Sequence, residues 1–130
     1  MIQEDYVSFE TAKLLKEKGF NERICHYYDD EEFLHKNTGL YLCNSAELDG
    51  RITAPTLQMA MKWLRENFNI NPVPYALSLG WAFDIFDLSN RDITGCKKLF
   101  SMDLPSESEC YNSYEEACEA AIKYCLENLI

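Results

Sequence analysis

Three stretches of the chain carry apolar residues at the three- and four-residue spacing of an amphipathic helix. They predict helices at residues 9–18, at residues 55–67, and from residue 114 to within two residues of the C-terminus. Ser8 and Ser113 are suitable N-cap residues, and Glu116 completes a capping box with Ser113. Gly19 supplies the left-handed position that ends the first helix. Local sequence alone therefore indicates where the first and third helices begin.

Short stretches rich in β-branched and aromatic residues lie between these helices. They predict strands at residues 24–28, 39–43, 73–79, 81–88 and 97–101. We expect the first two to pair across a polar connection, and the last two to form a hairpin whose turn is residues 89–92. Pro74 predicts that its strand begins there or lies at a sheet edge, and Gly80 fits either a turn or a bulge.

The order of these elements predicts an α+β fold in which three helices pack on an antiparallel-rich sheet of about four or five strands. No linker or low-complexity tract divides the chain, so we expect a single domain over residues 1–130. The expected core residues are Leu57, Met61, Leu64, Trp81, Phe83, Ile85, Ala117, Ala121 and Leu129.

Charge is the most informative surface property of the sequence. The 130 residues include 22 acidic and 12 basic side chains, for a net charge of −10, and the acids concentrate toward both ends. Such a surface disfavours direct binding to nucleic acid, whose phosphates attract Lys and Arg. A protein is therefore the expected partner, and the candidate contact residues are Asp29, Asp30, Glu31 and Glu32. An alternative is that this run and the acidic segment 103–119 imitate a phosphate backbone and occupy a basic protein.

The apolar residues, 47% of the chain, indicate an ordinary globular protein. No window approaches the roughly 18 consecutive apolar residues of a membrane span. The first residues contain two acids and no apolar run, unlike a secretory signal. We therefore expect a cytoplasmic protein with no membrane partner.

Six cysteines raise the question of disulfides or zinc. Cys118 and Cys125 are seven residues apart in a predicted helix, about 10 Å along its axis, which is too far for a disulfide. No C-x-x-C motif occurs, and we expect reduced thiols, mostly in the core, and no cofactor. The one metal-like group is Cys25, His26, His35 and Cys43. Neighbours in a strand point to opposite faces, so Cys25 and His26 would not share a zinc ion.

No catalytic motif surrounds any serine or cysteine, and no glycine-rich phosphate loop is present. A catalytic cysteine needs a base within hydrogen-bond reach, and the chain offers only two histidines. An enzyme that uses Cys43 or Cys25 with His26 remains an alternative, but the lack of a catalytic motif favours a binding protein over an enzyme.

Three segments, residues 4–20, 54–66 and 114–126, resemble the helices of small proteins of unassigned activity that phages and prophages of gut bacteria encode. The resemblance covers about a third of the chain and leaves the strands uncovered. Because no activity is assigned to these proteins, the resemblance identifies no functional residue in this chain. It implies an intracellular accessory protein of a mobile element, and we expect a non-catalytic protein-binding module.

Overall fold

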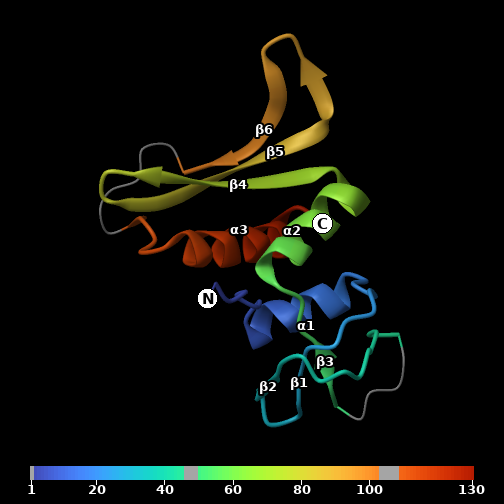
Figure 1. The fold of residues 1–130 in the computed structure, drawn as a ribbon. Helices are drawn as coiled ribbons and strands as arrows, with labels where there is room; N and C mark the ends of the chain where they lie inside the picture. Colours follow the sequence, from blue (N-terminus) through green and yellow to red (C-terminus); the bar gives the residue numbers. More distant parts are fainter. Residues whose placement is uncertain (1, 46–49, 103–108) are drawn as a thin grey trace. The chain divides into compact units, whose positions relative to one another are not determined.

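The structure is a computed structural model that describes residues 2–45, 50–102 and 109–130. The chain divides into two compact units, Met1–Ala60 and Met61–Ile130. Figure 1 shows their helices and strands along the chain. The prediction of a single domain is not tested by this division and stays a prediction.

In the first unit, helix α1 (Phe9–Glu17) has the predicted caps. The Ser8 hydroxyl accepts a hydrogen bond from the backbone N–H of Thr11 at 3.2 Å. At the other end Gly19 has a φ of +96°, and the chain reverses so that the Phe20 N–H donates to the Leu15 carbonyl at 2.9 Å. The buried apolar side chains of this unit include Val7, Ala12, Leu15, Phe20, Ile24, Ala54, Leu57 and Ala60.

Three two-residue strands form a small antiparallel sheet in the first unit: β1 (Tyr27–Tyr28), β2 (Leu34–His35) and β3 (Ile52–Thr53), in the order β2-β1-β3. The predicted pairing of residues 24–28 with 39–43 is reduced to a single bridge between Ile24 and Leu42. The reason is that β1 is already paired on both edges by β2 and β3.

The second unit contains most of helix α2 (Leu57–Phe68) and an antiparallel sheet of β4 (Ile70–Leu77), β5 (Gly80–Asp92) and β6 (Gly95–Ser101). The order is β4-β5-β6, so β4 is an edge strand, as Pro74 predicted. Pro72 and Pro74 are two residues apart and occupy equivalent positions in the strand, where neither needs an N–H. Asn69, with a φ of +56°, ends the helix before β4 begins.

Gly80 proves to be the first residue of β5, paired with Leu77 across a two-residue turn. The turn predicted at residues 89–92 is wrong, because these residues continue β5 and the hairpin closes at Ile93 and Thr94. Their turn-forming side chains instead shape an irregularity in β5, where the register shifts between Asp87 and Arg91.

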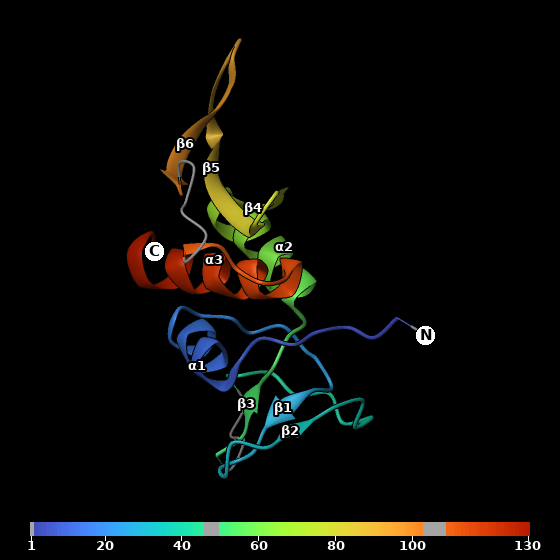
Figure 2. The same ribbon diagram turned by 90° about the vertical axis from the view of Figure 1, so that its left-hand side faces the viewer.

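Helix α3 (Tyr114–Asn128) packs against β4 and β5. Figures 1 and 2 show α3 beside the sheet of the second unit. The Ser113 hydroxyl accepts from the Glu116 N–H at 3.1 Å, as the capping box predicted. The Glu116 carboxylate accepts from the Asn112 N–H at 2.9 Å, one residue before the N-cap. Both bonds satisfy N–H groups at the start of the helix.

The expected core is largely confirmed, since Leu57, Leu64 and Ile85 and four others of the nine residues are buried. Trp81 and Leu129 are only half-buried. Trp81 is the second residue of β5, and Leu129 is the C-cap of α3. The α+β class with three helices is confirmed. A single sheet of four or five strands is wrong, because the strands divide into two three-stranded sheets.

Candidate functional site

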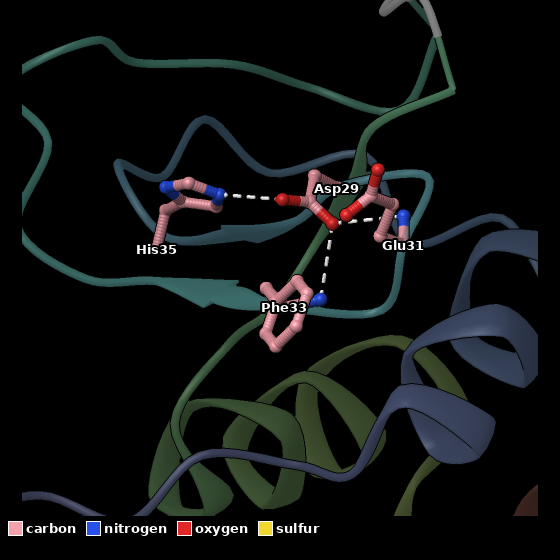
Figure 3. A network of polar contacts seen from close by, with 4 residues as sticks. All are labelled: Asp29, Glu31, Phe33 and His35. Carbon is pink, nitrogen blue, oxygen red and sulfur yellow. Dashed lines mark hydrogen bonds and ion pairs between the residues drawn. The ribbon is translucent and has the colours of Figure 1, made fainter.

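The acidic run expected to contact a partner lies in the loop between β1 and β2. Asp29 Oδ1 accepts hydrogen bonds from the backbone N–H groups of Glu31 (2.9 Å) and Phe33 (3.0 Å). Asp29 Oδ2 lies 2.8 Å from Nε2 of His35, on β2. Figure 3 shows the carboxylate between the imidazole and the two amide nitrogens. We call residues 29–33 the acidic turn.

Backbone bonds close the acidic turn on itself. The Asp29 N–H donates to the Phe33 carbonyl at 3.0 Å, and the Glu32 N–H donates to the Asp29 carbonyl at 3.0 Å. Glu32 adopts a left-handed φ of +68°. Asp30, Glu31 and Glu32 are exposed, and the Phe33 side chain is 64% exposed. The turn therefore presents three carboxylates and one phenyl ring on a loop of fixed geometry.

The side chains beside the acidic turn add further support. The hydrogen bond from His35 and that from the Phe33 amide hold the pKa of Asp29 below its ordinary value. The Tyr27 ring stacks on the His35 ring with centroids 4.8 Å apart, and the Arg51 guanidinium lies 5.1 Å from the Tyr27 centroid. Asp29 is thus used within the fold, which leaves the other three acids of the predicted contact set facing outward.

His26 has polar and aromatic surroundings of its own. Its Nδ1 accepts the Asn37 N–H at 2.9 Å, which assigns the proton of the neutral ring to Nε2. The Tyr6 ring lies edge-on at 4.7 Å, and burial lowers the pKa of His26. Cys25 Sγ is 3.9 Å from Nε2. Because Nε2 already carries the proton, the neutral ring is not arranged as a base toward this thiol.

The four residues considered as zinc ligands, Cys25, His26, His35 and Cys43, are not gathered around one point. Within residues 2–45, 50–102 and 109–130, no group of three or more His, Cys, Asp or Glu side chains is placed to hold a metal ion. His35 belongs to the acidic turn, and Cys43 Sγ lies 3.5 Å from the Ser45 hydroxyl. None of the six cysteines forms a disulfide. The expectation that most of them lie in the core is wrong, because only Cys118 and Cys125 are buried and the other four are half-buried.

A pocket of about 350 Å³ lies in the second unit, between the start of β5, the end of β6 and α3. It is lined by Phe83, Phe100, Met102, Tyr111, Ala120 and Tyr124, and Lys123 and Glu127 add charged groups. Its rings pack closely, with centroids 4.2 Å apart for Phe100 and Tyr124 and 5.3 Å for Phe83 and Phe100. We call it the aromatic pocket. Sequence reasoning missed it, although Ala120, Tyr124 and Glu127 share one helical face.

Residues 88–98 form a second feature that sequence reasoning missed, and we call them the hairpin tip. β5 extends past β4, because Ile70, the first residue of β4, pairs with Asp87. Figures 1 and 2 both show this end of the β5–β6 hairpin projecting beyond β4 and away from α3. Ile93, at the turn, is fully exposed, with a relative exposure of 105%.

The acidic segment 103–119, which could imitate a phosphate backbone, lies partly outside the described residues, because residues 103–108 are not among them.

Comparisons with known proteins do not place the chain in a family. No family model, no curated protein and no solved structure matches the chain. In the part of the chain that the structure describes, no helix combines the length and apolarity needed to cross a bilayer. A function therefore has to be inferred from the surface of the molecule itself.

Proposed function

We propose that this chain is a non-catalytic protein-binding module of a phage or prophage, which acts in the cytoplasm by occupying a basic protein partner. The observation that supports the proposal is the acidic turn. Phe33 is 64% exposed there, beside the exposed acids Asp30, Glu31 and Glu32. Asp29 fixes their backbone through two amide hydrogen bonds.

This combination has the chemistry of a contact site. Aromatic side chains are enriched in the cores of interfaces, where a few buried residues together contribute most of the binding free energy. A loop that is already ordered loses little entropy when it binds. The acids around Phe33 attract Lys and Arg and speed the encounter. The partner that fits is a protein whose apolar pocket is surrounded by basic side chains.

The test uses immobilised chain to capture proteins from a lysate of gut bacteria, followed by calorimetry with each purified captured protein. Phe33→Ser should weaken binding by about tenfold to a hundredfold, the value of burying one large apolar side chain. The triple variant Asp30→Asn, Glu31→Gln, Glu32→Gln should bind more weakly, with a smaller dependence on salt.

The matched control carries Glu4→Gln, Glu17→Gln and Glu22→Gln, three exposed acids of the same unit outside the turn. It has the same net charge as the triple variant of the turn, and it should bind like the wild type. Equal weakening by both triple variants, with no effect of Phe33→Ser, would contradict the proposal. That result, with binding lost steeply between low and high salt, would instead support imitation of a nucleic acid backbone.

A further inference from the structure

Side-chain hydrogen bonds at and just before the hairpin tip hold it in shape. Asp87 Oδ1 accepts from the Ser89 N–H at 3.0 Å and from its hydroxyl at 2.6 Å. Arg91 Nε donates to the Leu88 carbonyl at 2.7 Å. These bonds fix the irregular part of β5, and such irregularities bend and re-aim a strand. The tip is therefore an ordered, bent projection.

The end of this projection is an apolar side chain. Asp92 Oδ1 accepts from the Thr94 N–H at 2.8 Å and from the Thr94 hydroxyl at 2.5 Å, which fixes the turn on either side of Ile93. Isoleucine is β-branched and gains nothing from a fully exposed position in a turn. At the end of this projection the Ile93 side chain is accessible to another molecule.

The second unit also holds a site into which Ile93 fits. The aromatic pocket, at about 350 Å³, lies at the small end of the range of ligand pockets, roughly 300–1,000 Å³. The charges are complementary too. The hairpin tip has three cations and one acid, whereas residues 109–130, which supply α3, have five glutamates and one lysine. Glu127 and Lys123 both line the pocket, so the negative charge comes from the other glutamates of residues 109–130.

The tip of one chain does not reach the pocket of the same chain. Phe83, in the pocket, and Ile93 are ten residues apart along one hairpin, which corresponds to about 30 Å of strand. In both views the tip lies at the far end of β5 from the start of that strand. A pocket filled by Ile93 must therefore belong to a second molecule.

We infer that two copies of this chain form a reciprocal dimer, in which Ile93 of each copy enters the aromatic pocket of the other. Exchange of two identical contacts closes the assembly with twofold symmetry. The contact unites the exposed Ile93, the apolar rings of the pocket, and the opposite charges of the hairpin tip and α3. None of the residues in this contact belongs to the acidic turn, and the inference does not depend on the proposed function.

Sedimentation equilibrium over a concentration series tests the dimer. Wild type should show a reversible monomer–dimer equilibrium that weakens at high salt. Ile93→Ser removes one inserted side chain from each copy, so it should weaken dimerisation roughly a hundredfold. Leu79→Ser is the matched control, because Leu79 is a 59%-exposed aliphatic residue at the other hairpin of the same sheet. It should dimerise like the wild type.

Cross-linking tests the location of the contact. A photoreactive benzoylphenylalanine at position 93 of a ¹⁵N-labelled chain, mixed with unlabelled chain, should cross-link to unlabelled peptides that contain Phe100, Tyr111 or Tyr124. Ala120→Leu, which fills the pocket, should reduce both the cross-link and dimerisation. A monomer at millimolar concentration, equal effects of Ile93→Ser and Leu79→Ser, or cross-links within one chain only would overturn the inference. Ile93-dependent binding to anionic vesicles by a chain that stays monomeric would also overturn it.

Discussion

The charge state of His26 is selected by the fold around it. Nδ1 accepts the Asn37 N–H, and the Tyr6 ring covers one side of the imidazole. Protonation of the ring would break the first contact and place a charge where burial has already lowered the pKa of His26. The folded state therefore prefers the neutral ring more strongly than the unfolded state does.

This preference predicts a pH dependence of stability. The pKa of His26 is lower in the folded protein than its ordinary value of 6.5, so the contribution is present above pH 6.5 and is lost as the pH falls through the folded pKa. His26→Asn keeps an acceptor near the Nδ1 position but does not titrate. Urea unfolding in steps from pH 7.5 to 5 should show a shallower decline for His26→Asn than for the wild type. Parallel profiles for the two proteins would contradict this.

The cysteines should divide into two classes of reactivity. Cys118 and Cys125 are buried in α3, and burial raises the pKa of Cys118 to about 11 and that of Cys125 to about 12. At pH 7.5 less than about one in a thousand of these thiols is ionised. Iodoacetamide should modify them only in denaturant, whereas the half-buried Cys25, Cys43, Cys96 and Cys110 should react first. Peptide mass spectrometry after timed labelling measures this, and early labelling of Cys118 in the native protein would contradict it.

At the scale of elements, Gly80 marks a close approach of two backbones. Trp81 and Tyr111 exchange hydrogen bonds of 2.8 Å in both directions. A Cβ on Gly80 would lie 2.6 Å from the Tyr111 carbonyl oxygen, and the residue has a φ of +154°. The glycine therefore lets the segment before α3 pair with the start of β5.

Gly80→Ala should destabilise the protein more than the same change at Gly95. Gly95 also has a positive φ, +126°, but nothing lies within 4 Å of a Cβ built there. We expect about 1 kcal/mol for Gly95→Ala, from backbone strain alone, and about 3 kcal/mol for Gly80→Ala, from strain and the clash together. Thermal and urea unfolding measure both values. Equal losses would show that the approach of Tyr111 to Gly80 imposes no constraint.

Sequence predicts those elements whose signals are local. Ser8, Ser113 and Gly19 act within one helical turn, so both ends of α1 and the start of α3 were predictable. The strands of the first unit are two residues long, which is too short for an alternating pattern. Their pairing depends on contacts between distant residues, and β3 gave no signal at all. The turn predicted at residues 89–92 is wrong for a related reason. These residues are of the types that form turns, and Ser89 makes a turn-like hydrogen bond to Asp87, but they lie within strand β5.

At the scale of the molecule, the candidate surfaces also differ in whether their signal is local in the sequence or depends on contacts between distant residues. The acidic run could be read from sequence, but the use of Asp29 to order the turn depends on His35, which only the β1–β2 pairing brings near. The aromatic pocket needs the register of β5 and β6 against α3 and was not predictable. The exposure of Ile93 was not predictable either, because the sequence alone does not distinguish a single exposed isoleucine from a buried one.

The net charge leads to a prediction for the whole chain. Each unit carries eleven acidic and six basic residues, so both are equally negative and neither offsets the other. Such charge repels itself in the compact state more than in the expanded unfolded chain. At pH 7.5, a rise in NaCl from about 0.01 to 0.15 M shortens the screening length from about 30 to 8 Å.

Added salt should therefore raise the melting temperature by a few degrees, equivalent to about 1 kcal/mol. The control is the same salt step near the isoelectric point of about 4.6, where the net charge vanishes and the shift should too. Scanning calorimetry of Ile93→Ser at low concentration keeps any self-association out of the measurement. A fall in melting temperature at pH 7.5 would mean that attractive pairs such as Lys98 with Asp84, at 3.5 Å, outweigh the repulsion between like charges.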